Sequence, residues 1–169
     1  TDTTYWVEGA NVAGGGDAEG GKLENSNGTY HDVTQYFLVF DAYEDFTIDE
    51  VTVYADAAGP RTVQLRAENG DLVASSVINV PAGESVVEMN MNVPAGIGHS
   101  LRIQGDNGLW RDEDDSNVNF PYELGTMGAI TGTNVTGNNA DVYYYYFYDW
   151  KVSLPSVACA SDRETVEID

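Results

Sequence analysis

The chain has 169 residues, 42% of them hydrophobic, which is enough for one domain with its own core and excludes a disordered polypeptide. Only 7 basic residues face 28 acidic ones, so the formal net charge is −21, which excludes nucleic acids and anionic membrane surfaces as partners. Membrane insertion is also excluded, because no apolar run reaches the roughly 18 residues that a membrane span needs.

Strand-like segments follow one another along the chain, separated by turn residues, and no long segment has helical periodicity. Residues 11–28, rich in glycine and acidic residues, are predicted to form a loop, and 105–140 is the least regular part. The predicted strands are residues 3–8, 36–40, 46–54, 61–67, 72–80, 85–93, 100–105 and 142–152. This succession predicts an all-β chain that folds as a β-sandwich or jelly roll.

The predicted strand 142–152 is unusually aromatic. Because side chains alternate across a strand, its members fall into two sets. One set is Tyr143, Tyr145, Phe147 and Asp149, and the other is Tyr144, Tyr146, Tyr148 and Trp150. One face must belong to the core. The other face forms either an exposed platform for stacking on sugar rings or a surface packed beneath the long loop or a neighbouring domain.

A sugar-binding site is predicted in the irregular segment. Trp110 offers a ring for stacking, and Arg111 and Asp112 beside it offer hydrogen-bond donors and acceptors. Tyr122 is the fourth residue of this predicted ligand-binding set. Long irregular segments on a rigid sandwich often carry the binding function, which favours this location.

Catalysis is not predicted. His31 and His99 are the only histidines, and neither lies in a recognisable catalytic motif. No zinc motif or phosphate-binding loop occurs. With 28 acidic residues, a close pair of carboxylates is expected by chance and does not indicate a glycosidase. We therefore predict that the chain is not an enzyme.

The middle of the chain, roughly residues 11–154, resembles a jelly-roll module of large secreted or surface proteins of Bacteroidota, of the type IX secretion kind. The segments that carry the resemblance are residues 37–41, 46–55, 61–66, 80–83, 109–111, 120–122 and 144–152. Their order and spacing, rather than any single segment, make up the similarity. The resemblance implies an extracellular or cell-surface location and a polysaccharide or surface glycan as the partner.

The two ends resemble something else, the last two strands of an immunoglobulin-like domain. Residues 1–10 resemble its penultimate strand and 155–169 its final strand, so the jelly roll would be inserted between them and the ends would pair as an antiparallel ladder. In such domains the cysteine that matches Cys159 forms a disulfide with an earlier strand, which implies a partner outside this chain. A buried free thiol is the alternative.

The acidity has three interpretations: a solvated surface suited to salty water, calcium binding, or attraction to a cationic partner. Jelly-roll binding modules similar to this one hold a structural ion near the entrance to the first strands. The predicted calcium ligands are Asp17, Glu19, Glu24 and Asp149. None of the acidic clusters has the spacing of an EF-hand loop.

Taken together, the residues and the resemblance predict a non-catalytic extracellular module for binding or adhesion, directed to glycans, within a large secreted or cell-surface protein. The alternative is a structural repeat of an extracellular fibre or stalk. Such a repeat would assemble with neighbouring copies of the same protein by strand addition or domain stacking.

Overall fold

The structure is a computed structural model that describes the backbone of residues 4–7, 10–105, 107–113, 117–160 and 164–167, and the side chains of 15–105, 107–113 and 117–155. In these ranges the strands are β1 (Thr4–Val7), β2 (Ala10–Gly20), β3 (Gly28–His31), β4 (Leu38–Ala42), β5 (Phe46–Ala55), β6 (Gly59–Arg66), β7 (Leu72–Val80), β8 (Gly83–Val93), β9 (Gly96–Gln104), β10 (Leu109–Glu113), β11 (Tyr122–Glu123), β12 (Gly128–Thr133), β13 (Tyr143–Tyr145), β14 (Tyr148–Ala160) and β15 (Glu164–Glu167). The helical structure found there is one short 3₁₀ turn, η1 (Gly137–Asn139), and no helix in these ranges is suited to crossing a membrane.

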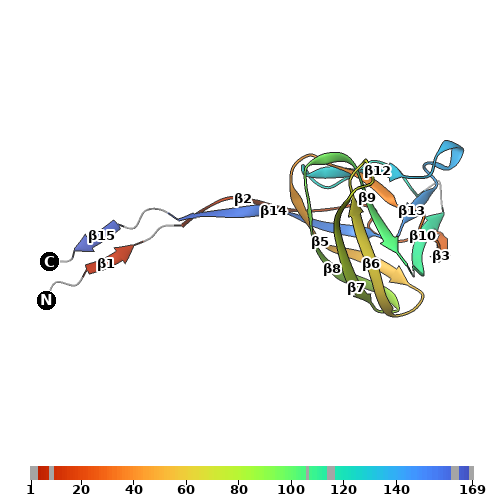
Figure 1. Ribbon diagram of the computed structural model, residues 1–169, viewed down its shortest axis with the longest axis horizontal. Coiled ribbons are helices and arrows are strands. Elements are labelled where there is room, and N and C mark those ends of the chain that lie inside the picture. Colours follow the sequence, from red (N-terminus) through yellow and green to blue (C-terminus); the bar gives the residue numbers. More distant parts are fainter. Residues whose placement is uncertain (1–3, 8–9, 106, 114–116, 161–163, 168–169) are drawn as a thin grey trace.

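Two antiparallel sheets form a sandwich, which confirms the predicted all-β fold class (Figure 1). One sheet has the order β13-β10-β5-β14-β2, with β3 also paired to β10 and β8 to β5. The other has the order β11-β12-β4-β9-β6-β7. Within the described residues, the strands that lack a partner on one side include β8 in the first sheet and β7 in the second, together with β2, β13 and β11 at the ends of the two orders.

The core forms because each sheet turns one set of alternating side chains inward. In β8, for example, Val87, Met89, Met91 and Val93 are buried while the residues between them are exposed. The largest fully buried side chains are Trp150, Tyr144, Tyr145, Tyr146, Tyr148, Phe40, Phe46 and Phe147. The interior is thus unusually aromatic, with most of these rings supplied by residues 144–150, in β13, in the start of β14 and between them.

A two-stranded ribbon leaves the sandwich and carries both ends of the chain (Figure 1). Its inner part is β2 paired with β14, from Trp150 opposite Gly20 to Ala160 opposite Ala10. Its outer part is β1 paired with β15, so the predicted antiparallel ladder between the ends is confirmed. β14 runs without a break across position 154/155, where the sequence placed a domain boundary, and the assignment of the ends to an immunoglobulin-like domain stays a prediction.

The prediction of a loop over residues 11–28 was wrong for residues 11–20, which belong to β2, while β3 begins only at Gly28. A glycine-rich segment has no apolar alternation by which a strand is recognised. It becomes a strand here because the backbone of β14 supplies its hydrogen-bond partners. The irregular segment 105–140 similarly contains β10, β11 and β12.

The predicted strand 142–152 is interrupted between β13 and β14. Tyr146 and Asp149 have φ angles of 69° and 42°, a left-handed conformation that ends the regular alternation of faces. As a result the five consecutive aromatic residues from Tyr144 to Tyr148 are all buried. The prediction of an exposed aromatic platform was therefore wrong, and the alternative of packing beneath other segments is confirmed.

Phe40 offers a direct test of the core. Its ring is fully buried, with centroids 5.3 Å from Trp150, 5.5 Å from His99 and 6.4 Å from Phe46. We expect Phe40→Ala to lower the free energy of unfolding by about 3–5 kcal/mol, because the cavity adds to the lost transfer energy. Tyr43→Ala, at a 59% exposed position, should change it by less than about 0.5 kcal/mol. Urea denaturation measures both variants, and an equal loss of unfolding free energy in Phe40→Ala and Tyr43→Ala would contradict this packing.

Candidate functional site

Asp112 lies in the interior rather than on a binding surface. Its side chain is 0% exposed, and its Oδ2 lies 2.6 Å from the ammonium of Lys22. Its Oδ1 accepts hydrogen bonds from the backbone N–H of Ser26, at 2.8 Å, and from the indole Nε1–H of Trp110, at 3.0 Å. Both oxygens of this buried carboxylate make contacts inside the protein, so Asp112 cannot contact a sugar at the surface. The prediction that Asp112 binds a glycan therefore loses its physical basis.

Lys22 occupies the centre of a small group of oxygen atoms. Besides Asp112, its Nζ donates to the backbone carbonyl of Glu24, at 2.8 Å, and to the hydroxyl of Ser26, at 3.0 Å. Its backbone N–H donates to the hydroxyl of Tyr144, at 3.2 Å. Carboxylate, carbonyl and hydroxyl oxygens are also the ligands that a hard cation takes, so the ammonium of Lys22 fills the role that the sequence gave to calcium near this entrance.

The residues predicted to bind calcium are not brought together. They are Asp17, Glu19, Glu24 and Asp149. Glu19 forms an exposed ion pair of 3.3 Å with Lys151, and the exposed Glu24 offers Lys22 only its backbone carbonyl. Within the described part of the chain, no three acidic, histidine or cysteine side chains are grouped so that they could hold a metal ion. Calcium binding by this ligand set therefore stays a prediction.

The buried tyrosines beside Asp112 hold their protons strongly. Burial raises the pKa of Tyr148 well above its ordinary value, and the negative charge of Asp112 raises it further. Burial likewise raises the pKa of Tyr144 and Tyr146, and it raises the pKa of Tyr145 to about 12. The hydroxyls of these buried tyrosines therefore stay protonated and neutral over the whole physiological pH range.

Trp110 and Arg111 point to opposite sides of β10, because neighbouring residues in a strand do so. Trp110 lies opposite Tyr30 of β3, and the two rings pack edge to face with centroids 5.1 Å apart. Tyr30 is 43% exposed and Trp110 is half-buried, so this Tyr30–Trp110 pair reaches the surface. The sequence missed Tyr30, since only the pairing of β3 with β10 places it there.

Arg111 belongs to a different cluster. Its guanidinium lies over the ring of Tyr143, 4.8 Å from the centroid, and forms a 3.0 Å ion pair with Glu113. Tyr122 lies in the other sheet, where its ring packs against Tyr144 with centroids 5.4 Å apart and its hydroxyl accepts a hydrogen bond from the backbone of Asn119. Of the four residues predicted to form one sugar site, the structure therefore joins only Trp110 and Asp112 by a hydrogen bond, while Arg111 points to the other side of β10 and Tyr122 lies in the other sheet.

Both histidines make contacts inside the fold. His31 Nδ1 lies 3.0 Å from the hydroxyl of Tyr146, and burial lowers the pKa of His31. His99 is buried, with its Nε2 2.9 Å from the carbonyl of Pro94. Each histidine is thus held in place by a contact within the fold.

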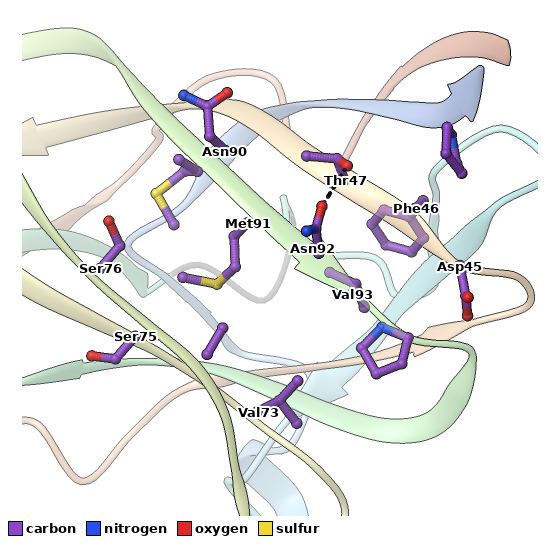
Figure 2. Close-up of a pocket in the computed structure, with 14 residues that line it drawn as sticks. Asp45, Phe46, Thr47, Val73, Ser75, Ser76, Asn90, Met91, Asn92 and Val93 are labelled. Carbon is purple, nitrogen blue, oxygen red and sulfur yellow. Dashed lines mark hydrogen bonds between the residues drawn. The ribbon is translucent and has the colours of Figure 1, made fainter. Parts of the chain in front are cut away.

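A groove of about 760 Å³, which the sequence did not predict, opens at the edge of the sandwich between β7 and β8. Figure 2 shows residues 73–76 of β7 on one side of it and residues 90–93 of β8 on the other. Its floor is apolar and consists of Phe46, Met89, Met91 and Val93. Its rim is polar, with Asp45, Asn90 and Asn92 among the lining residues. A signal for it exists in β7, where the inward positions change from Ile78 and Val80 to the small Ala74 and Ser76.

Cys159 lies in β14 opposite Asn11. Its side chain is outside the part of the chain that the structure describes, so the disulfide with a partner beyond this chain stays a prediction. Comparisons with family models, with curated proteins and with solved structures find no match to this chain. The resemblances noted in the sequence therefore also stay predictions.

The buried ion pair can be tested by removing its cation. We expect Lys22→Met to lower the free energy of unfolding by about 3–5 kcal/mol, because it leaves the carboxylate of Asp112 buried without a counter-charge. Lys151→Met is the matched control, since its ion pair with Glu19 is exposed and screened by solvent, so its loss should have a much smaller effect. Lys22→Met combined with Asp112→Asn should recover part of the loss. Equal effects of the two lysine substitutions would refute the buried pair.

Alkaline pH should unfold the protein cooperatively. An unfolded tyrosine loses its proton near pH 10, whereas burial raises the folded-state pKa of Tyr145 to about 12 and of its buried neighbours as well. The unfolded state therefore binds fewer protons above pH of about 10, and stability is lost as pH rises from there through the raised values. The exposed Tyr43 should ionise first, and the tyrosinate absorbance of the buried residues should then rise together with the loss of the circular dichroism signal of the fold. Ionisation of all tyrosines with the fold intact would contradict this prediction.

Proposed function

We propose that this chain is a non-catalytic extracellular binding or adhesion module, a β-sandwich held away from its host by a two-stranded ribbon. The observation that carries the proposal is the pairing of β2 with β14, continued by β1 with β15. Both strands that connect to the sandwich belong to this ribbon, and β1 and β15 lie side by side at its far end (Figure 1). A module inserted into another domain and presented on a spacer has this arrangement.

The ribbon also supports the insertion of this module between two strands of an immunoglobulin-like domain. A two-stranded sheet such as β1 with β15 is marginally stable alone in water. It gains stability when further strands of a host domain cover it. In the proposed arrangement the host supplies those strands and the cysteine partner of Cys159, and the sandwich supplies the binding surface.

Glycan binding is proposed at the Tyr30–Trp110 pair. Of the predicted sugar site, Trp110 reaches the surface together with Tyr30, which is 43% exposed. Apolar faces of sugar rings pack well on aromatic rings, and the net charge of −21 on the chain favours neutral or cationic glycans over anionic ones. This narrows the predicted glycan to a neutral polysaccharide or one with amino groups.

A glycan array tests this proposal. We expect the chain to bind neutral or amino glycans, and Tyr30→Ala to weaken binding by about tenfold, the effect of losing roughly 1.4 kcal/mol of stacking. Tyr43→Ala, at another exposed tyrosine, is the matched control and should bind as the unchanged protein does. Arrays run with calcium and with a chelator would show any role of that ion. Absence of binding to every glycan in both conditions would refute the glycan proposal.

The second candidate function is a structural repeat of an extracellular fibre or stalk. The favouring observation is that β1 and β15 each have one side without a strand partner in the described part of the chain. Such edges can pair with a neighbouring copy by strand addition. Electron microscopy of the native protein separates the candidates, because a fibre with this unit as its repeat supports assembly and dispersed particles support a displayed binding module.

A further inference from the structure

The groove between β7 and β8 is open because its two strands diverge. They are joined through the turn after β7, but they do not pair, since β7 pairs with β6 and β8 pairs with β5. Near the turn, Ile78 and Val80 fill the space between the sheets. Further along β7 the inward residues are Ala74 and Ser76, which are too small to cover the apolar floor. The wedge between the two strands is thus unfilled where the side chains become short (Figure 2).

β7 has an unprotected edge. Natural edge strands are usually blocked by charged side chains, prolines or bulges that prevent other strands from pairing with them. β7 reads Leu-Val-Ala-Ser-Ser-Val-Ile-Asn-Val and contains neither a charged residue nor a proline. Its one register shift against β6 lies at the start of the strand, between Leu72 and Ala74, and the pairing is regular from Ala74 to Val80. Leu72, Val73 and Val77 are 52%, 38% and 63% exposed, so the strand also presents apolar side chains to solvent. An edge of this kind favours the addition of another strand.

The charge at the groove indicates what kind of molecule could bind there. Asp45 is the one charged residue among those that line it, and the chain as a whole carries −21. A second copy is disfavoured because two such chains repel each other. The basic side chains that the structure describes are also already engaged, Lys22 and Lys151 in ion pairs with acidic residues and the four arginines in contacts of their own. The occupant that fits is therefore a different polypeptide that brings its own positive charge.

We propose that this groove binds an extended strand of a partner polypeptide, with apolar side chains at alternate positions and a lysine or arginine beside Asp45. The strand would pair with the free edge of β7 or β8, and its inward side chains would cover Met89, Met91 and Val93. Because a strand advances about 3.3 Å per residue, the stretch from residue 73 to 76 accommodates a core of four or five residues. The proposal rests on the binding function above but uses a surface separate from the Tyr30–Trp110 pair.

The probes are three fluorescein-labelled peptides of eight residues, in which valine, leucine or isoleucine alternates with threonine and two lysines stand at one end. Fluorescence anisotropy measures their affinity for the full chain. We expect at least one peptide to bind, and its counterpart with glutamates in place of the lysines to bind about fivefold or more weakly, as expected for one exposed charge pair. Asp45→Asn, which keeps an oxygen for the backbone N–H of Ala95, should reduce this difference.

Filling the groove should abolish binding. Ser76→Phe places a ring over the apolar floor, while Asn79→Phe places the same ring at an exposed position of the same strand and should leave affinity unchanged. Hydrogen exchange of the unchanged protein gives an answer even if Ser76→Phe fails to fold. Saturation with peptide should slow the exchange of backbone amides in β7 or β8.

Several results would overturn the proposal. These are no binding by any of the three peptides, equal loss with Ser76→Phe and Asn79→Phe, or protection of amides elsewhere in the chain. Self-association that Ser76→Phe removes would assign the groove to a second copy instead. None of these results depends on the glycan array, so the groove can fail while the proposed glycan function stands, and the reverse also holds.

Discussion

The buried carboxylate of Asp112 is the constraint on which much of this molecule depends. A fully buried charge is tolerated only when it is neutralised and hydrogen-bonded, and Lys22, Ser26 and Trp110 together meet that condition. Meeting it draws the segment after β2 across the molecule onto β10, some 90 positions later in the chain. The same segment then covers the tyrosine hydroxyls next to Asp112. The segment after β2 is thus organised around the ammonium of Lys22, in the region where the sequence predicted a metal ion.

The sandwich was predictable because its central strands bury alternate residues, and residues 46–54 and 61–67 display that alternation in the sequence itself. The pairing of the ends was predictable from their resemblance to neighbouring strands. β2 was not, since its partners are backbone groups of β14 and its own side chains carry no pattern. The Tyr30–Trp110 pair was only half predictable from the sequence. Trp110 and Arg111 are adjacent in sequence but point to opposite sides of β10. Tyr30 joins Trp110 only because β3 pairs with β10, and these segments are far apart in the chain.

Strand edges account for the two surfaces to which we assign binding or assembly. A closed barrel has no free edge, whereas this sandwich ends in β7 and β8 and its ribbon ends in β1 and β15. The small inward residues of β7 leave the space between β7 and β8 unfilled. This unfilled space distinguishes the groove from the edge of a sandwich in which large side chains close the gap between the sheets. The Tyr30–Trp110 pair differs in kind, because it offers rings rather than backbone groups. Carbohydrate and polypeptide partners would therefore occupy different places and could be bound together.

The ribbon also determines how the molecule responds to mechanical load. In an antiparallel ladder the hydrogen bonds lie across the strands, so tension that pulls β1 and β15 apart acts along those bonds and breaks them one after another, as a zipper opens. The outer pairs of β2 and β14 would separate next, residue by residue, before tension reached the part of β14 that is also paired with β5. The ribbon would therefore lengthen under weak force before the rest of the sandwich is loaded.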